Sequence, residues 1–259
     1  MRADLYLVDA GYAPSRQRAK QLVEAGGVTV DGKLVRKPAE EIDATVTHTV
    51  EVVDLQKYVG RGGQKLEGAL DAFGMDVAGL TAVDIGASTG GFTDCLLQRG
   101  ATHVTAVDAG IGQLAARLRA DARVRCIEQF NARDIGAEDI GGRVDLVVMD
   151  VSFISATYII PRFYDLLTDR GEAICLIKPQ FEVGRAMLGK GGIVKDASAH
   201  RFAIERVLQS GKESGLLPVG LIPSPIRGGD GNREFLVRFK KTDRDDRELT
   251  ETDIRLVLR

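Results

Sequence analysis

The stretch Leu80-Thr-Ala-Val-Asp-Ile-Gly-Ala-Ser-Thr-Gly-Gly-Phe92 decides the fold. It begins as an apolar run that carries a single acid, Asp84, and it changes abruptly to small residues between Gly86 and Gly91. This pattern is typical of a buried parallel strand that ends in a tight turn, where the lack of side chains lets a ligand lie against the backbone. We expect a helix to follow the turn over residues 92–97.

The glycine spacing in this turn indicates the class of ligand. A dinucleotide-binding turn has the pattern G-x-G-x-x-G, whereas this turn reads G-x-x-x-G-G and has Asp84 two residues before its first glycine. An acid at that position suits a positively charged ligand, and S-adenosylmethionine carries both an ammonium and a sulfonium group. The turn alone leaves a second interpretation open, which is a strand-to-helix connection that binds nothing.

Several later apolar runs end in polar residues that we expect at the same edge of the sheet. Asp108 and Asp150 each end such a run, and Lys178 lies near the end of another. Ligands of parallel α/β sheets bind at the carboxyl ends of the strands, so Asp108 is expected to accept hydrogen bonds from ribose hydroxyls. The loop that ends in Asp134 is expected near an adenine. A plainer interpretation also exists, because a strand-end aspartate often caps the next helix and a strand-end lysine usually reaches solvent.

The alternation of strands and helices predicts an α/β fold with a doubly wound, mostly parallel sheet of seven strands. The expected strands are residues 80–85, 103–108, 124–127, 144–150, 173–179, 216–222 and 234–239. A glycine-rich loop over 184–192 is a candidate lid or substrate contact.

Composition excludes several classes of protein. With 44% apolar and 28% charged residues, the chain has the composition of an ordinary globular protein. Its three cysteines are far apart and its three histidines are scattered, so we expect neither disulfides nor a metal site. The sequence shows no signal-peptide pattern and no apolar run that approaches the ~18 residues of a membrane span, so we expect a cytoplasmic protein without a membrane partner.

The first sixty residues differ from the rest. Two short helices are expected, the second over residues 16–24 after an N-cap at Ser15, and then a hairpin turns at Asp31-Gly32. Residues 15–37 contain six basic and two acidic residues, which is the charge distribution of a phosphate-backbone binder or simply of a solvated surface.

The spacing of residues in this segment resembles the S4 RNA-binding module. The resemblance covers about residues 1–55 and rests on Arg2-x-Asp4-x-x-Leu7, on Ser15-Arg16, on Ala19-x-x-Leu22 and on Gly27-x-Val-x-Val-Asp-Gly32. It implies an RNA partner. The residues expected to contact RNA are Arg2, Arg16, Arg18, Lys20, Lys33, Arg36, Lys37 and Arg61.

Most of the chain resembles the TlyA (haemolysin A type) family of ribosomal-RNA 2′-O-methyltransferases, which have a catalytic domain of the FtsJ/RrmJ type. The matching segments are 60–67, 84–92, 150–154, 178–182 and 231–235. The resemblance implies a class I (Rossmann-like) methyltransferase fold preceded by a small α+β S4-like domain, with S-adenosylmethionine as cofactor and no metal. The implied domains are an S4-like domain at 1–57, a linker at 58–63, a methyltransferase domain at 64–242 and a charged tail at 243–259.

The resemblance also implies the site residues. The family's K-D-K-E tetrad corresponds to Lys65, Asp150, Lys178 and Glu234, with Lys178 expected at the 2′-oxygen and Asp150 orienting it. The residues expected to bind the cofactor are Asp84, Gly86, Ala87, Ser88, Thr89, Gly90, Gly91, Phe92, Asp108, Asp134 and Asp150.

The family precedent for the substrate is a cytidine in 16S rRNA and, in some members, in 23S rRNA, on the ribosomal subunits. An alternative hypothesis is an RNA-binding ribosome-assembly protein that does not catalyse. A pore-forming role, suggested by the haemolysin name, has no support in a sequence without a membrane span or a long amphipathic basic helix. The sequence does not indicate the oligomeric state.

Overall fold

The computed structural model describes residues 1–53, 57–241 and 246–259, and it divides the chain into two compact units, Met1–Lys57 and Tyr58–Arg259. Each unit is described by itself. Residues 243–245, with which the expected charged tail begins, lie outside the described residues.

The first unit is small and α+β, as expected. It contains α1 (Ala3–Asp9), α2 (Arg16–Glu24) and an antiparallel sheet in the order β2-β1-β3, with β1 at Val28–Val30, β2 at Lys33–Leu34 and β3 at Val50–Val52. The Ser15 side chain accepts a hydrogen bond from the Arg18 amide and caps α2. Apolar residues from both helices and the sheet, such as Leu7, Leu22 and Val28, form its core.

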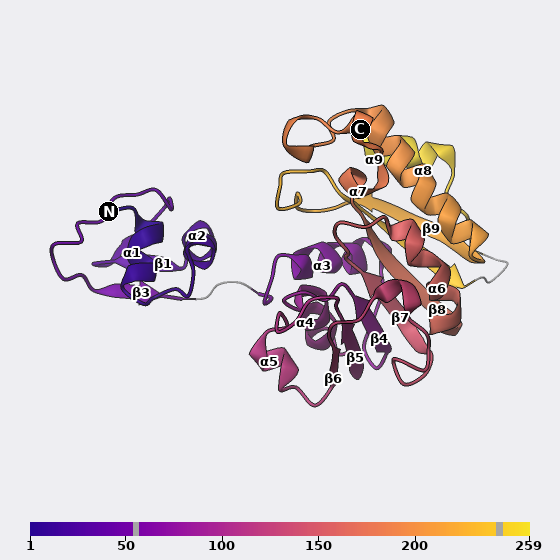
Figure 1. Cartoon of the computed structure of the whole chain (residues 1–259), viewed down its shortest axis with the longest axis horizontal. Helices are drawn as coiled ribbons and strands as arrows, with labels where there is room; N and C mark the ends of the chain where they lie inside the picture. Colours follow the sequence, from indigo (N-terminus) through magenta and orange to yellow (C-terminus); the bar gives the residue numbers. More distant parts are fainter. Residues whose placement is uncertain (54–56, 242–245) are drawn as a thin grey trace. The chain divides into compact units, whose positions relative to one another are not determined.

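The second unit is built on a seven-stranded sheet in the order β6-β5-β4-β7-β8-β10-β9 (Figure 1). The strands are β4 (Thr81–Ile85), β5 (His103–Val107), β6 (Val124–Ile127), β7 (Val144–Met149), β8 (Leu167–Ile177), β9 (Leu216–Pro223) and β10 (Phe235–Lys241). Among these described strands, β10 runs antiparallel to its neighbours β8 and β9, and the other pairs are parallel. The expected mostly parallel sheet of seven strands is confirmed.

Helices cover both faces of this sheet, which explains why the central strands read as continuous apolar runs. Along β7, Leu146 and Val148 pack in one core, whereas Val147 and Met149 pack in the core on the opposite face. The α-helices of this unit are α3 (Gly62–Phe73), α4 (Gly91–Gln98), α5 (Ala116–Arg119), α6 (Ile160–Leu166), α7 (Pro179–Glu182), α8 (Ala197–Glu213) and α9 (Glu251–Leu258). Short 3-10 helices are η1 (Ala132–Asp134), η2 (Ala156–Tyr158), η3 (Arg185–Met187) and η4 (Lys190–Gly192).

Two segments that the sequence placed outside the methyltransferase domain, the expected linker and the expected tail, have residues that pack within the second unit. Residues 58–63, expected as a linker, belong to this unit, because Tyr58 is 2% exposed in its core and Gly62 already begins α3. The Val59 amide also donates to Asp94 Oδ2 at 2.8 Å. Within the expected tail, α9 packs on the sheet through Ile254, which belongs to a main hydrophobic core.

Candidate active site

At the turn between β4 and α4, the backbone approaches the backbone of two other segments closely, at the edge of the sheet. Gly86 has a φ of +82°, and a Cβ added there would lie 2.5 Å from the backbone oxygen of Asp150. A Cβ on Gly91 would lie 2.9 Å from the Gly63 amide nitrogen. Only glycine fits at these two positions, because the start of α3 and the end of β7 both approach the turn closely.

Asp84 lies beneath this turn and is fully buried. Its Oδ2 accepts hydrogen bonds from the Thr93 amide at 2.9 Å and the Thr93 hydroxyl at 2.7 Å, whereas its Oδ1 has no hydrogen-bond partner among the described residues. Burial raises the pKa of Asp84 from 3.8 to about 7; the two bonds from Thr93 oppose this change and the charges of Asp150 and Asp108 add to it. Oδ1 is therefore the atom of this carboxyl group that is left to pair with a ligand.

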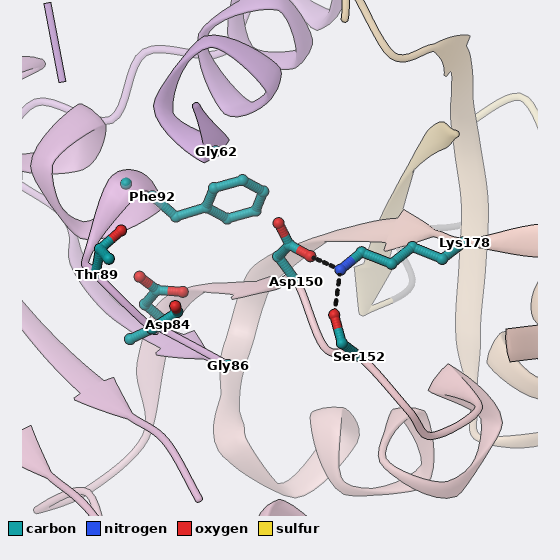
Figure 2. Close-up of a pocket in the computed structure, with 11 residues that line it drawn as sticks. Gly62, Asp84, Gly86, Thr89, Phe92, Asp150, Ser152 and Lys178 are labelled. Atoms are coloured by element: carbon teal, nitrogen blue, oxygen red, sulfur yellow. Dashed lines mark hydrogen bonds and ion pairs between the residues drawn. The ribbon is translucent and has the colours of Figure 1, made fainter. Parts of the chain in front are cut away.

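Two cavities meet at this turn, and four residues line both of them. The first has a volume of about 180 Å³ and is lined by Gly62, Asp84, Gly86, Ala87, Ser88, Thr89, Gly91, Phe92, Asp150, Ser152 and Lys178 (Figure 2). The second has a volume of about 420 Å³, and its lining includes Asp108, Phe130, Asn131 and Ile154. Together they form a cleft across the ends of β4, β5 and β7.

Most of the residues expected to bind the cofactor line this cleft, with two exceptions. Gly90 packs against the protein interior, since a Cβ there would lie 2.3 Å from Leu118 Cδ1. Asp134 is exposed in η1 and does not line either cavity, although the neighbouring Asn131 does. Asp108 accepts hydrogen bonds from the amides of Ser88 and Gly110 at 2.8 and 2.7 Å, one on each carboxylate oxygen.

The four tetrad residues form one chain of ion pairs. Lys178 Nζ lies 2.6 Å from Asp150 Oδ1, Lys65 Nζ lies 3.7 Å from Asp150 Oδ2, and Lys65 Nζ lies 2.7 Å from Glu234 Oε2. Lys178 and Asp150 line the first cavity, as Figure 2 shows. Lys65 and Glu234 are 7% and 2% exposed and line neither cavity. The cluster thus has one ion pair that faces the cleft and one that is buried behind it.

Two residues that shape this cleft, Ser152 and Glu182, were not among the site residues predicted from the sequence. Lys178 Nζ also donates to Ser152 Oγ at 2.7 Å. Glu182, which is buried in α7, accepts from Ser155 Oγ at 2.5 Å and from the Ala156 amide at 2.7 Å, and its burial raises its pKa. The glutamate therefore ties the segment after Asp150 to the segment after Lys178. The only sequence signal was that both residues lie inside the segments 150–154 and 178–182.

Two of the expected RNA-contacting residues of the first unit, Arg2 and Arg16, bind a buried acid. Asp4 is 0% exposed, and Arg2 and Arg16 both donate to its carboxylate through Nε at 2.9 Å. The hydrogen bond from Arg2, with a weaker one from Arg16, holds the pKa of Asp4 well below its usual range. Arg18 is half-buried, and four expected residues are exposed: Lys20, Lys33, Arg36 and Lys37. In the second unit, the exposed Arg61 donates to the Arg227 carbonyl at 2.9 Å.

No helix in the described part of the chain is both long and apolar enough to cross a membrane. Within the same residues, no group of three or more histidine, cysteine or acidic side chains is arranged to hold a metal ion.

Comparison with known proteins identifies the family. A family model described as FtsJ-like methyltransferase matches residues 58–241, and an S4 domain model matches residues 1–46. The chain is 45% identical to the 16S/23S rRNA (cytidine-2′-O)-methyltransferase TlyA of Mycobacterium tuberculosis over 94% of this chain and 91% of the relative. It is 43% identical to Hemolysin A of Brachyspira hyodysenteriae over 92% of this chain and 99% of the relative.

A solved structure, provisionally named as a hemolysin of Streptococcus thermophilus, has a TM-score of 0.78 and 41% identity, covering 100% of this chain and 94% of that one. The matches extend through both units and include the turn after β4 and the tetrad segments. The chain therefore belongs to the TlyA family of FtsJ-like methyltransferases, with an S4 domain at its N-terminal side.

Proposed function

We propose that this protein transfers the methyl group of S-adenosylmethionine to a ribose 2′-hydroxyl in ribosomal RNA. The observation that carries the proposal is the chain of ion pairs Lys178–Asp150–Lys65–Glu234, of which Lys178 and Asp150 line the same cavity as the glycine turn. A methyl donor and a hydroxyl acceptor must meet in line, and one cleft bordered by both features supports that placement.

The residues around the turn fit the cofactor. The unpartnered Oδ1 of Asp84 suits an ammonium group, Asp108 suits ribose hydroxyls, and Gly86 lines both cavities. When bound, S-adenosylmethionine supplies an electrophilic methyl carbon on a positively charged sulfur. We infer that the cofactor spans both cavities with its methyl end toward Asp150 and Lys178.

Lys178 is the residue we assign to the 2′-oxygen. A ribose hydroxyl is a weak nucleophile while it keeps its proton, so the proton must leave as the new oxygen–carbon bond forms and the sulfur–carbon bond breaks. Lys178 Nζ, in its neutral form, would accept that proton, and Asp150 would then stabilise the ammonium at 2.6 Å. Lys65, which is itself paired with Glu234, lies 3.7 Å from the second oxygen of Asp150 and would help to orient its carboxylate.

The S4 domain supports RNA as the substrate. Its fixed pair Arg2 and Arg16 and its exposed lysines would contact phosphates, which position an RNA without reading its sequence. The Mycobacterium tuberculosis relative is named as a 16S/23S rRNA (cytidine-2′-O)-methyltransferase, so we propose a cytidine in one or both of these RNAs. A ribosomal substrate would place the reaction in the cytoplasm.

A methyl-transfer assay tests this function. Purified 30S and 50S subunits from a strain that lacks the gene are incubated with protein and S-adenosylmethionine labelled on its methyl group, and modified positions are mapped by 2′-O-methyl sequencing. We expect label at a cytidine ribose with the wild type and its loss with Lys178→Ala, while calorimetry shows near-normal cofactor binding. Lys212→Ala, on the exposed side of α8, is the matched control and should remain active.

The outcomes separate the hypotheses. Wild-type protein that binds the subunits but binds no cofactor and transfers no methyl group would support the non-catalytic assembly factor. Near-full activity of Lys178→Ala would refute the role assigned to this lysine. Label on a base, rather than on a ribose, would refute 2′-O-methylation.

A further inference from the structure

The amino group of Lys178 has two partners on one short segment. Its Nζ lies 2.6 Å from Asp150 Oδ1 and donates to Ser152 Oγ at 2.7 Å, and Figure 2 shows both contacts converging on the nitrogen. Asp150 directly follows β7, and Ser152 lies two residues later. The tetrad accounts for the first contact only, so the serine hydroxyl is an additional polar group at the reacting end of the lysine.

The segment that carries Ser152 is fixed to the segment that carries Lys178. Lys178 directly precedes α7, and Glu182 of α7 accepts hydrogen bonds from Ser155 Oγ and from the Ala156 amide, at 2.5 and 2.7 Å. Glu182 therefore links the segment that follows Ser152 to the helix that follows Lys178. Ser152 itself is exposed and lines both cavities.

Tetrahedral geometry gives this second contact a consequence. An amine nitrogen has three positions besides its bond to Cε, and a single partner such as Asp150 leaves the group free to rotate about the Cε–Nζ bond. When one position points to Asp150 and a second to Ser152, rotation stops and one position remains. That position holds the third N–H of the ammonium form or the lone pair of the neutral form, and Lys178 lines the cavity.

We propose that Ser152 is a positioning residue that orients the amino group of Lys178 toward the substrate oxygen. The inference rests on the proposed methyl transfer, because it assigns to Ser152 the alignment of the group that accepts the 2′-hydroxyl proton. Ser152 acts on the rate of the chemical step, whereas the affinity for cofactor and RNA comes from other residues. Its loss therefore lowers kcat and leaves KM unchanged.

The test compares Ser152→Ala and Ser152→Thr with the wild type in the labelled assay on 30S and 50S subunits. Removing a hydrogen bond to a charged group lowers kcat by about ten- to a hundredfold. KM for the subunits and the calorimetric affinity for S-adenosylmethionine should stay within about twofold. Thr keeps the hydroxyl and should restore most of kcat. Ser198→Ala, which alters an exposed serine of α8, is the matched control and should behave as the wild type.

Each outcome decides between the two claims. A wild type that transfers no methyl group to either subunit refutes the proposed function and this inference together. An active wild type with an equally active Ser152→Ala refutes the inference alone. A raised KM or a weakened cofactor affinity with kcat unchanged would make Ser152 a binding residue, which also contradicts positioning. A thermal melt of each variant verifies that it is folded.

Discussion

Replacing Asp84 by asparagine should change how the stability of the second unit depends on pH. The carboxyl group is completely buried under the glycine turn, and its pKa is raised from 3.8 to about 7, chiefly because burial disfavours the charged form. Asparagine has the same shape and still offers an oxygen to the amide and hydroxyl of Thr93. The substitution thus removes a titrating group and keeps its principal hydrogen bonds.

The sign and size follow from proton linkage. The folded protein binds this proton more tightly than the unfolded chain, so the contribution of Asp84 to stability is present at low pH and is lost as pH rises through the window from about 4 to about 7. With these two pKa values the wild type should lose about 2.5 kcal/mol of unfolding free energy between pH 5 and pH 8 from this group alone. The amide introduced by Asp84→Asn does not titrate, so the variant escapes this loss.

Urea unfolding of the wild type and Asp84→Asn at pH 5, 6, 7 and 8, without cofactor, measures the difference. Other titrating groups are common to both proteins and cancel in the comparison. The free energy of unfolding of the variant relative to the wild type should rise by about 2.5 kcal/mol across this range. Asp169→Asn, which removes a carboxylate that is 92% exposed, is the control and should give a curve nearly parallel to the wild type. Parallel curves for Asp84→Asn would refute a buried, protonated carboxyl at this position.

Three further predictions concern the turn, the buried glutamate and the S4 domain. Gly86→Ala forces a Cβ to within 2.5 Å of a backbone oxygen at a residue with positive φ. It should therefore destabilise the protein by about 1–3 kcal/mol and abolish cofactor binding measured by calorimetry. Gly184→Ala, where an added Cβ meets open space, should do neither. Ser155→Ala removes a donor from Glu182 and should lower the unfolding free energy in urea by about 1–3 kcal/mol; an unchanged midpoint would contradict this. Arg16→Ala should weaken binding to ribosomal RNA and reduce the salt slope by about one, and an unchanged slope in filter binding would remove Arg16 from the RNA interface.

The parts of the fold that sequence predicted well are those that one local pattern determines. Strands buried on both faces read as apolar runs, so β4, β5 and β7 lie within one or two residues of their expected bounds. β3 was missed because Val50-Glu-Val52 is too short for its alternation to be distinguished from a loop. β8 begins six residues before its expected start, since Leu167 already pairs with Val144 of β7 ahead of a register shift that no local pattern encodes.

The candidate site shows the same division between local and long-range information. The turn with Asp84 and the strand-end residues Asp108 and Asp150 could be derived from the sequence itself. Lys65 and Glu234 could not, because they are 169 residues apart in the chain and their contact at 2.7 Å, between α3 and the residue before β10, exists only in the folded protein. Family resemblance supplied them.

The way in which the four charged groups of the ion-pair chain pair with one another suits the proposed chemistry. Glu234 neutralises Lys65 at 2.7 Å, and Lys65 stays 3.7 Å from Asp150, so Asp150 remains the close partner of Lys178. Without Glu234, the buried ammonium of Lys65 would have only Asp150 to compensate its charge, and it would compete with Lys178 for that carboxylate. A buried acid that lines neither cavity thus has a reason to be present, because it leaves the carboxylate at the cleft paired with Lys178, the lysine that we assign to the substrate oxygen.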